Sequence, residues 1–135
     1  MIEKAELLVK LTCEHYKLTS LKRGKERPFK IVKNKDNVVV RVAEIRMALS
    51  YFLYKYCPLN MAHIAALVGY SDHTSLSLQY KKIDYFIQTE DEKIYPYYLV
   101  VKQIAENIGI NMDAERLILN RNKLFKMANQ IYVVK

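Results

Sequence analysis

The sequence predicts an all-α domain of five or six helices. Three observations support this. The chain of 135 residues contains only three glycines and three prolines, so few residues interrupt a helix. Apolar residues recur every three or four positions through most of the chain, which is the spacing of one helix face. The length suits one folding unit with a real core, so we treat residues 1–135 as a single domain.

The first third of the chain predicts a helix followed by a basic loop. A helical repeat over residues 2–19 forms one stripe of Leu8, Leu11, His15 and Leu18. From 20 to 37 the repeat disappears, and Gly24 and Pro28 interrupt the chain. This stretch holds seven basic and two acidic residues, so it carries more than half of the net charge of +8. We expect an irregular loop, with its basic residues concentrated over 22–35.

The next two predicted helices are separated by a proline. Residues 39–57 form a long helix that Pro58 ends, with an inward stripe of Val42, Ile45, Leu49, Phe52, Leu53 and Tyr56. Asn60 can then cap a short helix, which Gly69 closes because glycine readily takes the left-handed conformation. The inner face of this short helix consists of Met61, Ile64, Ala65 and Val68.

A further helix follows almost at once, over about residues 72–88. Ser71 or Asp72 can cap it. Its inner stripe is Leu76, Tyr80, Ile83 and Ile87, and its outer face carries Thr74, Ser77, Lys81 and Lys82. We expect the central helices to share one core made of Leu49, Leu53, Ile64, Ala65, Val68, Leu76, Tyr80 and Ile83.

Two more helices are predicted near the C-terminus. The first covers 94–108, with Pro96 in its first turn and an inward stripe of Tyr97, Val101, Ile104 and Ile108. The second covers 112–129, with Leu117, Leu124 and Ala128 inward, and Gly109 and Asn111 separate the two. The last five residues have the composition of a strand without a pairing partner, so we expect a tail there.

Composition excludes several classes of protein. The chain lacks the pattern of a signal peptide and any apolar run of ~18–20 residues, so we expect a cytoplasmic protein without a membrane span. Cys13 and Cys57 are far apart and are expected to be buried apolar residues. The three histidines have no metal-ligand spacing, and the chain has no phosphate-binding glycine loop. We therefore expect no metal, no cofactor and no enzymatic activity. The pI near 9.4 suits a partner that is a polyanion.

The segment 60–88 has the chemistry of a helix-turn-helix. Ala65 is small enough for two helices to pack closely, Gly69 permits a sharp turn, and small polar residues begin the second helix. In such a unit the start of the second helix enters the major groove of duplex DNA. A plain corner between two helices would produce the same pattern, but the neighbouring basic residues favour DNA.

Within this segment, SDHTSL resembles the Asp-His-Thr-Thr-Val signature of the C-terminal DNA-binding domain of the bacterial replication initiator DnaA, a member of the Trp-repressor-like superfamily. The similarity covers roughly residues 5–108. It includes CEHYKL at 13–18, the basic stretch, VVRVAEIRMAL at 39–49 and YKKI at 80–83. The extra helix and tail at 109–135 lie beyond it. Since the chain has no ATPase domain, we do not expect a replication initiator itself.

The resemblance implies which residues contact DNA. The base-reading positions of the family fall on Asp72, His73, Thr74 and Ser75, and the position of its minor-groove arginine falls on Lys35. Arg23 or Arg27 could take over that role. Ala43 replaces a basic residue of the family's long helix, although Arg41 and Arg46 lie near. The full candidate set for binding double-stranded DNA is Asp72, His73, Thr74, Ser75, Lys81, Lys82, Arg23, Lys25, Arg27, Lys33, Lys35 and Arg41.

Other interpretations stay open. IAALVGYSDHTSLSLQYKK also resembles the second helix-turn-helix of AraC-type transcription regulators. The chain could instead be a protein-interaction module of phage or mobile-element origin that uses its tyrosines as contacts, since tyrosine is common at interfaces. The segment 109–135 could dock on the core, dimerise or recruit a protein partner. The target DNA and the role in replication, transcription or mobile-element maintenance do not follow from the sequence.

Overall fold

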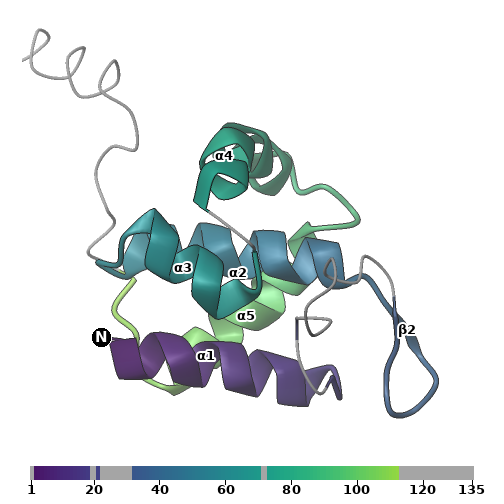
Figure 1. Cartoon of the computed structure of the whole chain (residues 1–135). Coiled ribbons are helices and arrows are strands. Elements are labelled where there is room, and N and C mark those ends of the chain that lie inside the picture. The colour runs from purple at the N-terminus through teal and green to yellow at the C-terminus, as the bar shows by residue number, and fades with distance from the viewer. Residues whose placement is uncertain (1, 19–20, 22–31, 71–72, 113–135) are drawn as a thin grey trace, which may run out of the picture.

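The computed structural model describes residues 2–18, 21, 32–70 and 73–112. Over these residues the chain forms five helices and one two-stranded antiparallel sheet (Figure 1). In chain order the elements are α1 (Ile2–His15), β1 (Val32–Lys33), β2 (Val39–Val40), α2 (Val42–Tyr56), α3 (Met61–Val68), α4 (His73–Gln88) and α5 (Tyr95–Asn107). The predicted all-α class is confirmed. Apart from Met112, the helix predicted at 112–129 and the tail after it lie outside the described residues.

Helix α2 lies at the centre of the fold. It packs against α5, α3 and α4, whereas α1 packs against α5 and α3. Figure 1 shows α1 and α4 on opposite sides of the layer that contains α2, α3 and α5. The hydrophobic core includes all eight residues that the sequence predicted for it, namely Leu49, Leu53, Ile64, Ala65, Val68, Leu76, Tyr80 and Ile83. Because α4 is an outermost element, one of its faces packs on this core and the other points away from it.

The ends of α3 follow the predicted capping chemistry. The Asn60 side chain accepts a hydrogen bond from the His63 backbone N–H at 2.7 Å, which satisfies one of the donors that a helix start leaves open. Gly69 has φ 92°, and its N–H donates to the carbonyl of Ala65. Tyr70 N–H donates to the same carbonyl at 2.9 Å. These caps end α3 sharply and direct the chain toward α4.

The buried face of α5 is shifted by about one residue from the predicted one. Its buried residues are Tyr98, Val101 and Ala105, whereas Tyr97 is half-buried. The reason is aromatic packing: the Tyr98 ring meets the Tyr51 ring edge-on at 5.6 Å between centroids. Tyr97 instead lies at the margin of the core, where its hydroxyl accepts a hydrogen bond from the Arg41 backbone N–H at 3.1 Å. Pro96 is in the first turn, as predicted.

Two predicted boundaries are wrong. Residues 39–40 do not begin the long helix but form β2, which pairs with β1 in the register Val32 with Val40 and Lys33 with Val39. A hairpin therefore occupies the end of the stretch 20–37 that we expected to be irregular. The first helix ends at His15 rather than at 19, since Lys17 has a left-handed φ of 56° and Leu18 N–H donates back to the Cys13 carbonyl.

Candidate nucleic-acid interface

Helix α4 has a buried stripe and an exposed stripe on opposite sides. Successive helical residues are rotated by about 100°, so residues three, four and seven apart share a side. The buried stripe consists, as predicted, of Leu76, Tyr80, Ile83 and Ile87. The exposed stripe consists of Thr74, Ser77, Leu78, Lys81, Lys82 and Tyr85. The predicted candidates Thr74, Lys81 and Lys82 thus lie together on one accessible face, which we call the outer face of α4.

The outer face of α4 is positively charged. Asp84 is the single acidic residue of this helix, and it is half-buried with its Oδ1 accepting a hydrogen bond from the Tyr51 hydroxyl at 2.6 Å. Within the described part of the chain neither Lys81 nor Lys82 forms an ion pair with Asp84 or with another carboxylate. After α4 the charge reverses, because Glu90, Asp91 and Glu92 follow in succession. A polyanion is consequently favoured along the first three turns of α4 and disfavoured beyond its end.

Tyr51 of α2 holds α4 in place. Its ring stacks on that of Tyr80 at 5.3 Å between centroids, with 19° between the planes. Its hydroxyl donates to Asp84 and accepts longer hydrogen bonds, both at 3.4 Å, from Lys55 and Gln88. Burial, and then the hydrogen bond to Asp84, raises the pKa of Tyr51 to about 12. The hydroxyl therefore keeps its proton at neutral pH and stays a donor to the helix that carries the outer face.

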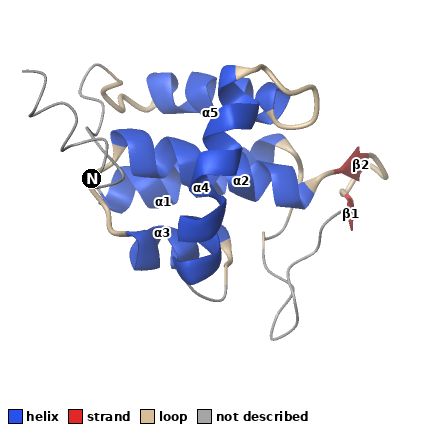
Figure 2. Cartoon of the chain, turned by 90° about the horizontal axis from the view of Figure 1, so that it is seen from above, coloured by secondary structure: helices blue, strands red, loops and turns tan. Residues whose placement is uncertain are grey.

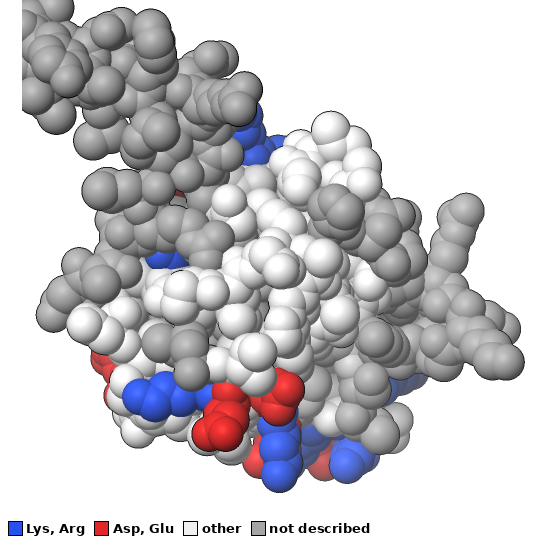
Figure 3. All heavy atoms as spheres, turned by 60° about the vertical axis from the view of Figure 1, so that its left-hand side comes forward, with Lys and Arg blue, Asp and Glu red and all other residues white. Residues whose placement is uncertain are grey.

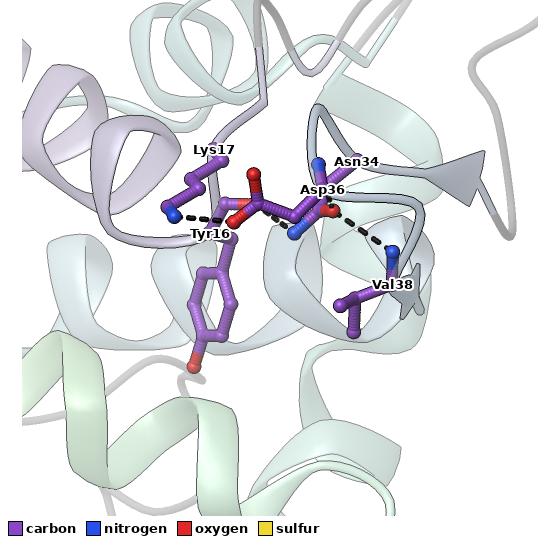
Figure 4. Close-up of polar contacts among 5 residues, drawn as sticks. All are labelled: Tyr16, Lys17, Asn34, Asp36 and Val38. Atoms are coloured by element: carbon purple, nitrogen blue, oxygen red, sulfur yellow. Dashed lines mark hydrogen bonds and ion pairs between the residues drawn. The ribbon is translucent and has the colours of Figure 1, made fainter.

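The hairpin β1–β2 is a second basic element, and Figure 2 shows it projecting from the helical body beyond the start of α2. Its turn is organised by Asn34, whose side-chain oxygen accepts from the backbone N–H groups of Asp36 and Val38 at 2.9 and 3.0 Å. The Asn34 side-chain nitrogen donates to the Tyr16 carbonyl at 2.9 Å, which ties the turn to the end of α1 (Figure 4). The Lys17 ammonium also forms an ion pair with Asp36.

The side chains of Lys33 and Lys35 are exposed on this hairpin. The backbone of Lys35 is fixed, because its N–H donates to the Lys17 carbonyl at 3.2 Å. Asn37 completes the turn with φ 62°, a left-handed conformation that asparagine tolerates. Two predicted basic residues therefore stand on an ordered projection instead of an irregular loop.

The two arginines at the start of α2 have different environments. Arg41 Nε lies 3.3 Å from Glu44 Oε1, so the charge of this predicted contact is partly balanced within the first turn. Arg46 is only 5% exposed; its guanidinium donates to the Leu21 carbonyl at 3.3 Å and lies over the Tyr70 ring. Burial lowers the pKa of Arg46, and Tyr70 partly opposes this effect. Of the two arginines noted near Ala43, Arg46 therefore faces the protein interior, whereas Arg41 lies nearer the surface.

The other predicted contacts are described only in part. Asp72, Arg23, Lys25 and Arg27 lie outside the described residues. His73 and Ser75 belong to the first turn of α4, and only their backbone is described. The structure therefore brings together Thr74, Lys81 and Lys82 on α4 and separately Lys33 and Lys35 on the hairpin, while Arg41 stands apart in its pair with Glu44.

The surface of α1 has a different charge pattern. Its exposed charged residues are of both signs and include Glu3, Lys4, Glu6, Lys10 and Glu14. Figure 3 shows positive and negative side chains next to each other along the lower edge of this side of the molecule, where α1 lies. The described residues contain 12 of the 22 Lys and Arg but 10 of the 14 Asp and Glu. For the described residues, the argument for a polyanionic partner thus depends on where the basic side chains lie and not on the total charge.

An open hollow of about 600 Å³ lies between α1 and α3, and Lys35 of the hairpin also lines it. Its walls include the apolar residues Val9, Cys13, Leu67 and Leu21, together with charged residues such as Lys10. Burial raises the pKa of the Cys13 thiol, which therefore stays protonated. Both cysteines are buried and free, as expected. Sequence periodicity could not reveal this hollow, because it forms between elements far apart in the chain.

The described residues contain no group of three or more His, Cys, Asp or Glu side chains placed to hold a metal ion. None of the helices described has the length and apolar character required to cross a membrane. Comparisons of the chain with known protein families, curated proteins and solved structures found no match.

Proposed function

We propose that this chain binds double-stranded DNA in a sequence-specific manner through α3 and α4, and that it is not an enzyme. The observation that carries the proposal is the outer face of α4. This face follows a sharply capped helix and bears Thr74, Lys81 and Lys82. The single carboxylate of α4, that of Asp84, accepts a hydrogen bond from Tyr51. A helix of this kind places its first turns against base edges and its later lysines against phosphates.

The hairpin supports the proposal as a second contact. Exposed lysines on a narrow projection can follow the phosphate backbone or approach the neighbouring minor groove. This arrangement agrees with the proposed relationship to the C-terminal domain of DnaA, a member of the Trp-repressor-like superfamily. In that domain an arginine of the basic loop enters the minor groove. The proposed role is in replication, transcription or the maintenance of a mobile element.

Selection of bound duplexes from a random pool by the full chain tests this proposal. We expect an enriched sequence that binds more tightly than random DNA, and an affinity for both that falls steeply with salt as counterions are released. The enriched site would then be measured by fluorescence anisotropy at several salt concentrations. The proposal would be contradicted if no sequence were enriched, or if the affinity did not change with salt concentration.

Recognition of another protein is the second candidate function. It is favoured by Leu78 and Tyr85, two large side chains that are 79% and 64% exposed on the outer face of α4. Such residues on one helix face can fit an apolar groove of a partner. The salt dependence of the binding affinity distinguishes the two functions, because apolar docking depends on salt far less than contact with phosphates does.

A further inference from the structure

Leu78 is the most exposed large apolar side chain among the described residues. It is 79% exposed, compared with 64% for Tyr85 and 46% for Leu99 of α5. The core under α4 is formed by Leu76, Tyr80 and Ile83, so Leu78 takes no part in it. Leu78 is therefore accessible to a partner, and its burial in a complex would recover the stabilisation that it lacks in water.

The neighbours of Leu78 specify what kind of complex this is. Leu78 follows Thr74 by one turn, and at about 1.5 Å per residue the two lie about 6 Å apart along the helix axis. In the next turn Lys81 and Lys82 lie on either side of it, rotated by about 60° and about 40° respectively. Leu78 is therefore on the midline of the outer face, with one lysine on each flank.

This pattern matches the cross-section of a major groove. The groove floor carries base edges, and its two walls are lines of phosphates. A side chain on the midline faces the floor while lysines on the flanks face the walls. An apolar side chain finds only one apolar partner on that floor, which is the 5-methyl group of thymine. The basic flanks favour this occupant over an apolar groove in a protein, which would require its own acidic rim.

We propose that Leu78 determines specificity by contacting a thymine methyl group in the DNA site. This inference rests on the proposed function and goes beyond it, because the predicted base-reading residues stop at Ser75. Thr74 and Leu78, one turn apart, would contact bases within about two steps of each other, given a rise of about 3.4 Å per base pair.

Methyl deletion in the DNA tests the contact. The full chain would first select its preferred duplex, and each thymine in that duplex would then be replaced in turn by deoxyuridine, which lacks only the methyl group. At one position we expect wild-type affinity to fall about three- to fourfold, the effect of losing one buried methyl-sized contact. Leu78→Ala should bind the unmodified duplex several-fold more weakly and should be indifferent to uracil at that position.

Leu99→Ala is the matched control, because it makes the same chemical change at an exposed leucine of another helix. It should keep the wild-type response to uracil, and circular dichroism should show both variants folded. If Leu78→Ala keeps the wild-type response at every thymine, or if wild type shows none, the role of Leu78 is refuted while sequence-specific binding stands. If the wild-type chain selects no duplex at all, the proposed function and this inference fall together.

Discussion

The hydroxyl of Tyr51 should contribute measurably to the stability of the fold. In Tyr51→Phe the ring still stacks on Tyr80, but the 2.6 Å hydrogen bond to Asp84 is lost. Hydrogen bonds to charged groups contribute about 1.5–3 kcal/mol. Because Asp84 is only half-buried, water can partly replace the lost donor, and the 3.4 Å hydrogen bonds from Lys55 and Gln88 add little. We expect a loss of about 1–2 kcal/mol in the free energy of unfolding.

Urea denaturation followed by circular dichroism measures this loss as a lower midpoint at unchanged slope. Tyr85→Phe is the control, because it deletes the same hydroxyl from a ring that is 64% exposed. It should leave the free energy of unfolding within about 0.5 kcal/mol of wild type. Equal midpoints for Tyr51→Phe and Tyr85→Phe would refute the conclusion that the bond from α2 holds α4 in place.

Further predictions concern the interface and pH. Thr74→Ala should cost about 1–3 kcal/mol on the selected duplex with little change on random DNA, as measured by anisotropy at matched salt; equal losses on both would argue against base reading. Lys81→Ala should instead weaken both duplexes together and reduce the salt slope by about one. Replacing Lys33 and Lys35 together by alanine should lower the slope by about two, and an unchanged slope would exclude the hairpin from the interface. Because the pKa of Tyr51 is raised from 10 to about 12, this group should not change the wild-type stability below pH 10, and the stability should fall as the pH rises from 10 toward 12. Tyr51→Phe should therefore lose less stability than wild type over that interval in urea titrations.

The sequence predicted those parts of the fold that depend on local chemistry. The caps of α3 at Asn60 and Gly69 follow from side chains within a few residues of the helix ends. The buried stripe of α4 follows from its spacing of four, three and four. For the same reason the exposure of Thr74, Lys81 and Lys82 was predictable, since residues opposite a buried stripe face outward.

The features that were missed depend on contacts between distant residues. The hairpin requires Asn34 to reach the Tyr16 carbonyl, 18 positions earlier in the chain, and no local pattern encodes that contact. Arg46 lies on the inward stripe by helical spacing, three residues before Leu49, but its charge favoured an exposed position until the Leu21 carbonyl and the Tyr70 ring were seen to enclose it. Leu78 was missed for a different reason: spacing also places it opposite the buried stripe, but only the polar and charged residues of that face were considered as contacts.

The hairpin turn depends on the side chain of Asn34 and should be less stable than the helical core. Three hydrogen bonds from this one side chain shape the hairpin turn and attach it to α1, whereas each strand contributes only two residues. Opening the turn of the hairpin therefore breaks a small set of contacts, while Val40 at the end of β2 can stay in the core. The amide protons of Asp36 and Val38 should exchange with solvent through this local opening, long before global unfolding exposes those of α2. The chain can thus reshape its basic projection while the helices that support α4 stay folded.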